Sequence, residues 1–421
     1  MIDHLRSAVE LSRRPHRGLE KLHERFGSVC TLGVWPLRYV FLLGPEANRF
    51  VFANSRLFRW REAFEVLVPV GGETALIVSD GADHERRRRL VAPAFARQHV
   101  DGYMQMVRAT ADAAIDSWRP GQVLDLYGEL RRVIRRSTIE VLFGSRLAAD
   151  EPDLGRALQL VLAVIDQPPV RQQVQRLGLP SWRRALAARA AVERRVRAEI
   201  DHRRRNPDPD AADVLTLLLG SHDDGSGLTD VEIVDQVISL IAAGYDTTSA
   251  AMGWAMYAVL ADPEVAERAS TGPSGPGWTY LDGVVSETLR LYPPAVVGAR
   301  HVVEEFGFAG TRVPAGSLLL YSPFVTHRLP ELWAQPLRFD PQRWDPGRPG
   351  YRRPGPHEFL PFGGGPHRCI GAAFATAEMT VLLERLLART SLQLQSHDPQ
   401  PVGLAAMRPR HGPLARVLDV T

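Results

Sequence analysis

The chain has 421 residues, of which 45% are hydrophobic and 24% charged, and its formal net charge is +3. A chain of this length is longer than one that usually folds around a single hydrophobic core. We therefore expect a large domain with a smaller lobe. The small net charge argues against nucleic acid as a partner. The sequence lacks both the long apolar run of a membrane-spanning helix and a signal peptide, and its two cysteines provide no disulfide framework. We therefore expect a cytoplasmic globular protein without a membrane span.

The N-terminal region predicts a short amphipathic helix over residues 18–26 and then a β-hairpin. Two β-rich runs cover residues 28–32 and 39–43, with a Trp-Pro turn between them. Cys30 alternates with apolar neighbours in the first run, which indicates core packing. After a helix over 44–53, residues 59–77 lack a clean period and predict a loop that could lie over a ligand.

Residues 83–98, DHERRRRLVAPAFARQ, predict a helix with many cations. His84 and Arg88 stand four apart and share a helix face, whereas Arg86 and Arg89 project toward the opposite side. Two hydrogen-bond donors therefore point the same way from this helix. The alternative is a solvated basic face.

Residues 101–220 are mostly helical by period, with a polar break at 206–210. Two helices are expected to flank a loop over residues 178–182, where glycine and proline interrupt the pattern. The sequence by itself indicates only a helix, a turn and a helix at this place.

Residues 229–261 give the longest helical pattern, which opens with a capping box of Thr229 and Glu232. Its middle, AAGYDTT, places a glycine, an acid and two hydroxyls in an apolar helix, which is costly without a purpose. The Thr247 hydroxyl can bond back to the Ala243 carbonyl and, with Gly244, loosen the helix into a small groove. Asp246 beside it can carry protons. A kink that only packs against a neighbouring helix is the alternative.

Residues 280–292 predict a helix with Glu287 and Arg290 three apart, and Arg343 follows in the segment FDPQRW. A pair of this kind is weak evidence alone, since many surface helices carry one. Between these segments, residues 306–320 predict short strands and turns, a small β lobe.

The segment 359–377, FLPFGGGPHRCIGAAFATA, places the lone Cys369 between a glycine run and a helical pattern. Glycines permit a tight loop beside a flat ligand. A thiol at a helix N-terminus should have a lowered pKa, as a metal ligand needs. Zinc is disfavoured, because Cys30 is the only other cysteine and no CxxC or HExxH is present. An inert cysteine in a glycine-rich turn is the alternative.

Phe362, Gly365, Cys369 and Gly371 match the FxxGxxxCxG motif, so the chain resembles the cytochrome P-450 superfamily of haem-thiolate monooxygenases. The other motifs fall in the family's order, and the resemblance extends from about Gly18 onward. It implies a mainly α fold with a small β lobe, built from about 28–43 and 295–325, and one P-450 domain over 1–421. Haem b would lie between the long helix and the cysteine loop.

The resemblance also implies roles for individual residues. Cys369 would be the axial ligand of haem iron, while Asp246 and Thr247 would supply protons. The remaining residues implied at the haem are His84, Arg88, Arg300 and His367 for the propionates, Ala243 and Gly244 for the groove, and Phe362, Gly365 and Gly371 for the loop. Glu287, Arg290 and Arg343 would form a buried structural cluster. An apolar substrate pocket is expected at Phe64, Val66, Leu67, Val296 and Val297.

The reaction implied is insertion of one oxygen atom of O2 into a lipophilic molecule of terpenoid, steroid, fatty-acid or polyketide type, as in secondary metabolism. Electrons from NAD(P)H would arrive through a ferredoxin reductase and a ferredoxin that docks at Arg86 and Arg89, and the protein is expected to be a monomer. Two alternatives stay open. The same scaffold can carry out oxidative coupling or dehydration, or it can act as a non-catalytic haem-thiolate sensor.

Overall fold

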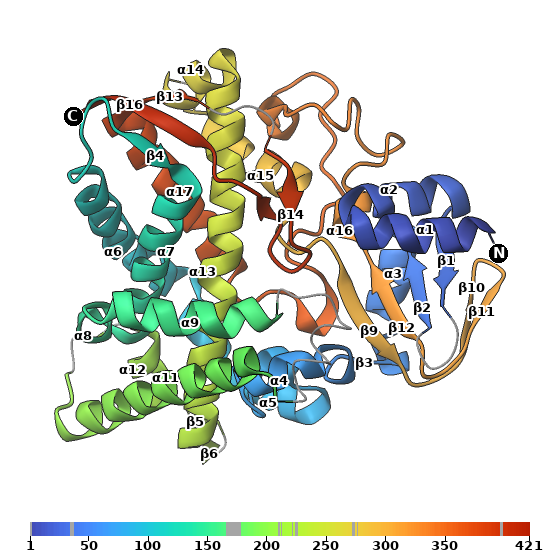
Figure 1. Cartoon of the computed structure of the whole chain (residues 1–421), viewed down its shortest axis with the longest axis horizontal. Coiled ribbons are helices and arrows are strands. Elements are labelled where there is room, and N and C mark those ends of the chain that lie inside the picture. Colours follow the sequence, from blue (N-terminus) through green and yellow to red (C-terminus); the bar gives the residue numbers. More distant parts are fainter. Residues whose placement is uncertain are drawn as a thin grey trace.

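The computed structural model describes residues 2–33, 38–165, 178–208, 211, 213–220, 222–223, 226–271, 274–275, 277–395 and 399–421. Helices make up most of the fold, and the longest, α13 (Asp230–Ala261), runs through its middle. In Figure 1 a group of helices lies to one side of α13, and a β sheet with the N-terminal helices lies to the other. The predicted fold class, mainly α with a small β portion, is confirmed.

The helices account for nearly every segment with a helical period. The α-helices other than α13 are α1 (Ile2–Arg13), α2 (Pro15–Phe26), α3 (Pro45–Ala53), α4 (Val68–Gly71), α5 (Gly81–Val91), α6 (Arg97–Ile115), α7 (Leu126–Phe143), α8 (Ser145–Ala148), α9 (Glu151–Ile165), α11 (Pro180–Arg205), α12 (Val214–Leu219), α14 (Pro263–Thr271), α15 (Tyr280–Leu291), α16 (Pro323–Thr326) and α17 (Ala372–Arg389). The 3-10 segments are η1 (Ser55–Leu57), η2 (Glu62–Leu67), η3 (Leu76–Val78), η4 (Ala92–Phe95), η5 (Pro341–Trp344) and η6 (Gly365–His367).

The principal sheet joins strands from distant parts of the chain, in the order β1-β2-β12-β9-β3. These strands are β1 (Val29–Leu32), β2 (Tyr39–Leu42), β3 (Phe58–Arg59), β9 (Gly298–Val302) and β12 (Leu318–Tyr321). β1 and β2 pair antiparallel, with Cys30 opposite Phe41, so the predicted hairpin is confirmed. Its Trp35-Pro36 turn lies outside the described residues. Cys30 is buried, as its alternation predicted.

Smaller sheets complete the fold. A three-stranded sheet pairs β13 (Thr390–Leu394), β16 (Leu414–Val420) and β4 (Val123–Asp125), so the C-terminal strand packs beside a strand from the first third of the chain. The two-stranded sheets are β5 (His222–Asp223) with β6 (Ser226–Gly227), β7 (Ser274–Gly275) with β8 (Trp278–Thr279), β10 (Phe306–Phe308) with β11 (Thr311–Val313), and β14 (Pro401–Val402) with β15 (Arg408–Pro409).

Helix α13 is fixed at its start by the predicted capping box, which is confirmed. The Thr229 hydroxyl accepts from the Glu232 amide, and the Glu232 carboxylate accepts from the Thr229 amide at 3.0 Å. Most of the helix is then buried, largely against α7 and neighbouring helices. The stretch around Gly244 stays helical, so the sequence motif does not interrupt the helix.

Residues 59–77 differ from the loop predicted for them. They form the short helices η2 and α4 and part of η3. Two side chains of α13 hold the end of this segment: Asp235 accepts from the Thr74 amide at 3.0 Å, and Gln236 accepts from the Leu76 amide at 2.7 Å. Because these bonds span more than 150 residues of sequence, no local period could signal them.

The last helix described before residue 178 is α9, which ends at Ile165, and α11 is the next one described. Helix α11 begins at Pro180, so 180–182 belong to a helix, while 166–177 lie outside the described residues. Among the helices that the structure describes, none is both long enough and apolar enough to cross a membrane.

Candidate functional site

The loop that carries Cys369 depends on its glycines. Gly363 and Gly365 have φ of 66° and 68°, a region that other residues rarely adopt. At Gly364 a Cβ atom would lie 2.6 Å from the Phe52 ring. The Cys369 amide then donates to the Phe362 carbonyl at 2.9 Å, which closes the loop. Steric constraints therefore require glycine at each of these three positions.

Cys369 has an exposed surface, and many protein atoms also lie around its thiol. The predicted lowering of its thiol pKa is wrong for the protein alone. Burial raises the pKa of Cys369, and this outweighs the Gly371 amide and the nearby Arg88 and Arg368 guanidinium groups, which lower it. Coordination to a metal ion would deprotonate the thiol outright.

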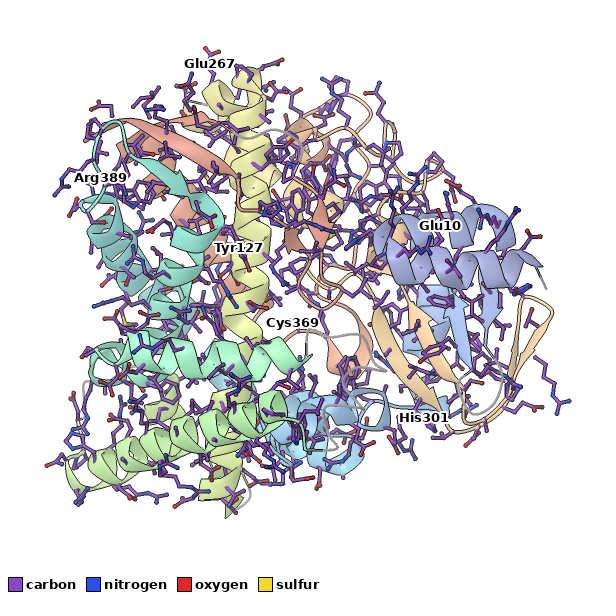
Figure 2. The ribbon with its side chains drawn as sticks, viewed as in Figure 1. Glu10, Tyr127, Glu267, His301, Cys369 and Arg389 are labelled. Atoms are coloured by element: carbon purple, nitrogen blue, oxygen red, sulfur yellow. The ribbon has the colours of Figure 1, made fainter. Side chains whose placement is uncertain are left out.

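Helix α13 is less buried at the predicted motif AAGYDTT than along most of its length. Leu240, Ala243, Gly244 and Thr247 are not buried, whereas most of the helix is. Their spacing of i, i+3, i+4 and i+7 places them on one face. Phe362 and Ile370 of the cysteine loop pack against the same hydrophobic cluster as the buried side of α13. In the view of Figure 2, Cys369 is drawn next to the middle of this helix.

The hydroxyl of Thr247 lies where the sequence placed it. It donates to the Ala243 carbonyl at 2.8 Å and lies 3.4 Å from the Gly244 carbonyl. Asp246 has a partner that the sequence did not reveal: Arg131 of α7 donates to its carboxylate at 2.8 Å. Arg131 is 115 residues away in the chain and belongs to no motif, so only the packing of α7 on α13 brings the two together.

Three of the four residues predicted to bind propionates, His84, Arg300 and His367, form a connected group at Trp60. The His367 ring stacks on the Trp60 ring with centroids 4.4 Å apart, and the Arg300 guanidinium lies 4.2 Å from the Trp60 centroid. The rings of His84 and His367 are 4.1 Å apart. His367 lies 3.3 Å from a carboxylate oxygen of Asp80. Trp60 and Asp80 had no signal in the sequence.

The Glu287 carboxylate lies at the centre of a buried cluster. Arg290 donates to it twice at 2.8 Å, both side chains are fully buried, and Arg343 lies 3.4 Å away. The Trp344 indole also donates to it, at 2.9 Å. The contacts expected among the three charged residues are thus present, and Trp344 is an additional member.

The predicted pocket residues do not form one pocket. Val296 is fully buried in a core cluster of the β-rich region, and Val297 packs against that cluster, so the prediction that Val296 lines an open cavity is wrong. Phe64 stacks on Trp60 with centroids 4.5 Å apart. Leu67 packs against a small cluster with Val68, and Val66 is half-buried.

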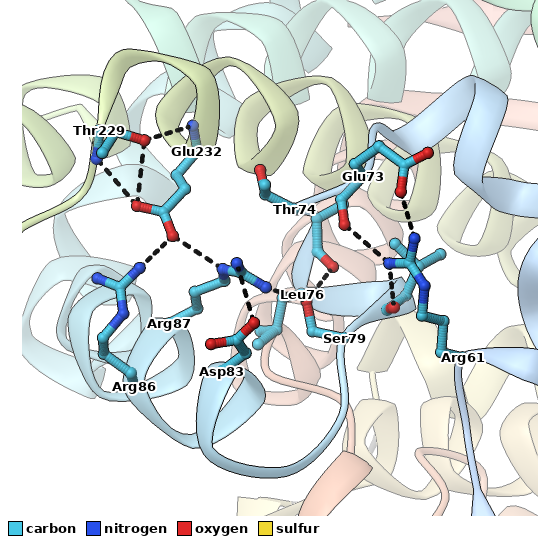
Figure 3. A network of polar contacts seen from close by, with 12 residues as sticks. Arg61, Glu73, Thr74, Leu76, Ser79, Asp83, Arg86, Arg87, Thr229 and Glu232 are labelled. Atoms are coloured by element: carbon cyan, nitrogen blue, oxygen red, sulfur yellow. Dashed lines mark hydrogen bonds and ion pairs between the residues drawn. The ribbon is translucent and has the colours of Figure 1, made fainter.

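The predicted outer position of Arg86 is also wrong. Arg86 and Arg87 of α5 both donate to the buried Glu232 carboxylate at the start of α13 (Figure 3). Glu232 thus compensates two cations as well as capping the helix. Arg89 is exposed. Helical spacing could not show that Arg86 is half-buried and bonded to α13, because that contact depends on how the two helices pack.

Comparison with known proteins identifies the family. The sequence profile described as Cytochrome P450 matches residues 4–271 and 276–410. A protein provisionally named cytochrome P450 139 in Mycobacterium tuberculosis (strain ATCC 25618 / H37Rv) is 50% identical over 402 residues, 92% of this chain and 94% of the relative. The cyclooctat-9-en-7-ol 5-monooxygenase of Streptomyces melanosporofaciens is 32% identical over 91% of this chain and 86% of the relative. The solved structure of retinoic acid bound cyanobacterial CYP120A1 is similar with a TM-score of 0.82 and 25% identity, over 94% of this chain and 93% of that one.

The fold and these similarities define a P450-type protein. The chain belongs to the cytochrome P450 family and is a P450 monooxygenase, as its motifs predicted. The family uses haem and O2.

The residues of this chain fit a haem. Cys369 offers one soft sulfur ligand with an open face, which suits haem iron. His84 and Arg88 make no side-chain hydrogen bond within the described part of the chain, and burial lowers the pKa of the His84 imidazole to about 4. His84 is buried and Arg88 half-buried, and donors placed in this way suit the carboxylates of an anionic ligand. The small residues Ala243 and Gly244 leave room for a flat group on α13.

Proposed function

We propose that this monooxygenase inserts one oxygen atom of O2 into a lipophilic small molecule, with Cys369 as the axial thiolate ligand of haem b. The observation that carries the proposal is the exposed Cys369 in a glycine-determined loop, packed with the helix whose small-residue face is open. Bound haem would supply oxygen activation, which the thiolate promotes by donating electron density. His84, Arg88, Arg300 and His367 would hold its propionates, within one domain over 1–421.

The protein's own residues would manage protons and substrate. Thr247 presents its hydroxyl on the open face of α13, and Asp246 beside it can exchange protons with solvent once it separates from Arg131. A substrate of terpenoid type is favoured, because a 32% identical relative is named for a reaction on cyclooctat-9-en-7-ol and a structural neighbour binds retinoic acid.

The direct test uses purified, haem-loaded protein. Its reduced carbon-monoxide complex should have the red-shifted Soret band of thiolate ligation, and candidate terpenoids should shift the haem spin state by displacing water. With ferredoxin, ferredoxin reductase and NAD(P)H, the bound compound should gain one oxygen atom from labelled O2. A product without labelled oxygen would favour coupling or dehydration instead.

Thr247→Ala should bind substrate as the native protein does, yet form on the order of tenfold less product per electron consumed. The lost hydroxyl lies on the open face of α13, and the remaining electrons should leave as hydrogen peroxide. Thr247→Ser keeps the hydroxyl and is the matched control. If the alanine variant couples electrons to product as well as the serine variant does, Thr247 has no part in proton delivery.

The ferredoxin is proposed to dock near Arg89, because Arg89 is exposed whereas Arg86 is half-buried against Glu232. Arg89→Glu should slow ferredoxin-driven turnover by about tenfold at low salt, because charge steers such encounters. Peroxide-driven turnover should stay unchanged. Arg312→Glu, on an exposed hairpin strand of the β-rich region, is the control and should alter neither rate. Equal loss in both assays for Arg89→Glu would point to a damaged site rather than to docking.

A further inference from the structure

His327 is a fully buried histidine that connects two parts of the molecule far apart in sequence. It directly follows α16. Its ring atom Nε2 lies 2.9 Å from the Leu360 amide nitrogen, and Nδ1 lies 3.1 Å from the Arg290 carbonyl oxygen. The ring therefore spans from the C-terminal turn of α15 to the segment that enters the cysteine loop.

The two contacts assign the tautomer of His327. The Leu360 amide can only donate, so Nε2 must accept, and the Arg290 carbonyl can only accept, so Nδ1 must carry the proton. The neutral Nδ1-protonated form satisfies both contacts at once. A second proton on Nε2 would face the Leu360 N–H group, beside the buried cations of Arg290 and Arg328.

The Leu360 amide is a direct attachment point of the cysteine loop. Leu360 is itself buried, and its carbonyl accepts from the Gly363 amide at 3.0 Å. Two residues beyond Leu360, the Phe362 carbonyl accepts from the Cys369 amide at 2.9 Å. The His327 imidazole thus binds the segment 360–362, and the Cys369 backbone is bonded to the end of that segment.

The buried cluster around Glu287 and Arg290 also contacts His327 and the base of the cysteine loop. Arg290 donates to the His327 carbonyl at 2.8 Å, so that residue is held through its backbone as well as its ring. The ring also packs against Phe359, with centroids 5.3 Å apart. Phe359 in turn packs on Trp344, whose indole donates to Glu287. Among these residues, His327 is the polar one whose side chain bonds directly to the backbone of the cysteine loop.

We propose that His327 is a positioning residue for Cys369. Its Nδ1-protonated imidazole fixes the Phe359–Phe362 segment against α15, and so sets where the cysteine sulfur stands relative to haem iron. The inference rests on the proposed ligand role of Cys369. Without the Nε2 acceptor, the buried Leu360 amide has no partner on that side, and the loop base can shift away from α15.

Three variants of the haem-loaded protein separate the two ring contacts. His327→Gln can present an oxygen near the Nε2 position and keep the Leu360 bond, His327→Asn reaches only the Nδ1 position, and His327→Phe keeps neither. We expect the glutamine variant to keep at least half of the thiolate-type Soret band in the reduced carbon-monoxide complex. The asparagine and phenylalanine variants should lose most of it, and their 357–363 amides should exchange hydrogen for deuterium faster.

His16→Phe is the matched control, because His16 is also buried and bonds through Nε2 to a backbone oxygen, that of Gly403, at 2.9 Å. It should lower the melting temperature without changing the Soret band. If His327→Asn and His327→Phe retain the band, or if His327→Gln loses it as fully as His327→Phe, the positioning role is overturned. Absence of the band in the native protein would instead overturn the ligand role of Cys369. If the phenylalanine variant does not fold, the glutamine and asparagine pair decides the question.

Discussion

Cys369→Ala is expected to abolish the thiolate-type Soret band of the reduced carbon-monoxide complex and to reduce oxygen insertion to background. The reason is that no second thiol can replace the ligand: Cys30, the only other cysteine, is buried in β1. The loop geometry should persist, because the Cys369 amide rather than its side chain bonds to Phe362. The spectrum of the purified variant, reconstituted with haem, is the measurement.

Cys30→Ala makes the same chemical change at a core position and is the control. It should keep the band and lose only stability, by about 1 kcal/mol, as is typical of a small core truncation. If Cys369→Ala keeps the band while Cys30→Ala loses it, the ligand assignment is wrong. If both variants keep it, the band does not arise from Cys369, and the ligand assignment is wrong in that case too.

The sequence predicted those features that depend on local chemistry. The α13 capping box follows from residues three apart, and the Thr247 back-bond from residues four apart. Both are properties of one helix and need no knowledge of its neighbours. The hairpin of β1 and β2 was likewise visible in alternation and a turn.

The features that the sequence missed are contacts between distant segments. Arg131 reaches Asp246 because α7 packs on α13, and Arg86 reaches Glu232 because α5 lies against the start of α13. Glu378 of α17 is fully buried and accepts from Ser137 of α7 at 2.8 Å. Burial raises the pKa of Glu378 to about 8, which no local pattern could indicate.

Glu287→Gln is expected to lower the free energy of unfolding by about 3–5 kcal/mol, the usual cost of leaving a buried charge without its partner. The native carboxylate accepts from Arg290, the Trp344 indole and the Asp340 amide at 2.8 to 3.0 Å. An amide offers only one acceptor oxygen, and its NH2 group would face donors. The fully buried Arg290 would then lack its counter-charge. The denaturant midpoint and the rate of haem loss measure the effect.

Glu264→Gln is the matched control for the charge change. Glu264 is 76% exposed and lies 3.8 Å from Arg268 one helical turn away, so its loss should change stability by less than about 0.5 kcal/mol. Because the Trp344 indole and Phe359 connect Glu287 to the base of the cysteine loop, Glu287→Gln should also release haem faster, whereas Glu264→Gln should not. Equal stability of the two variants would mean that the buried cluster contributes no more than a surface pair. A destabilised Glu287→Gln protein that holds haem as firmly as the native protein would confine the cluster's role to folding.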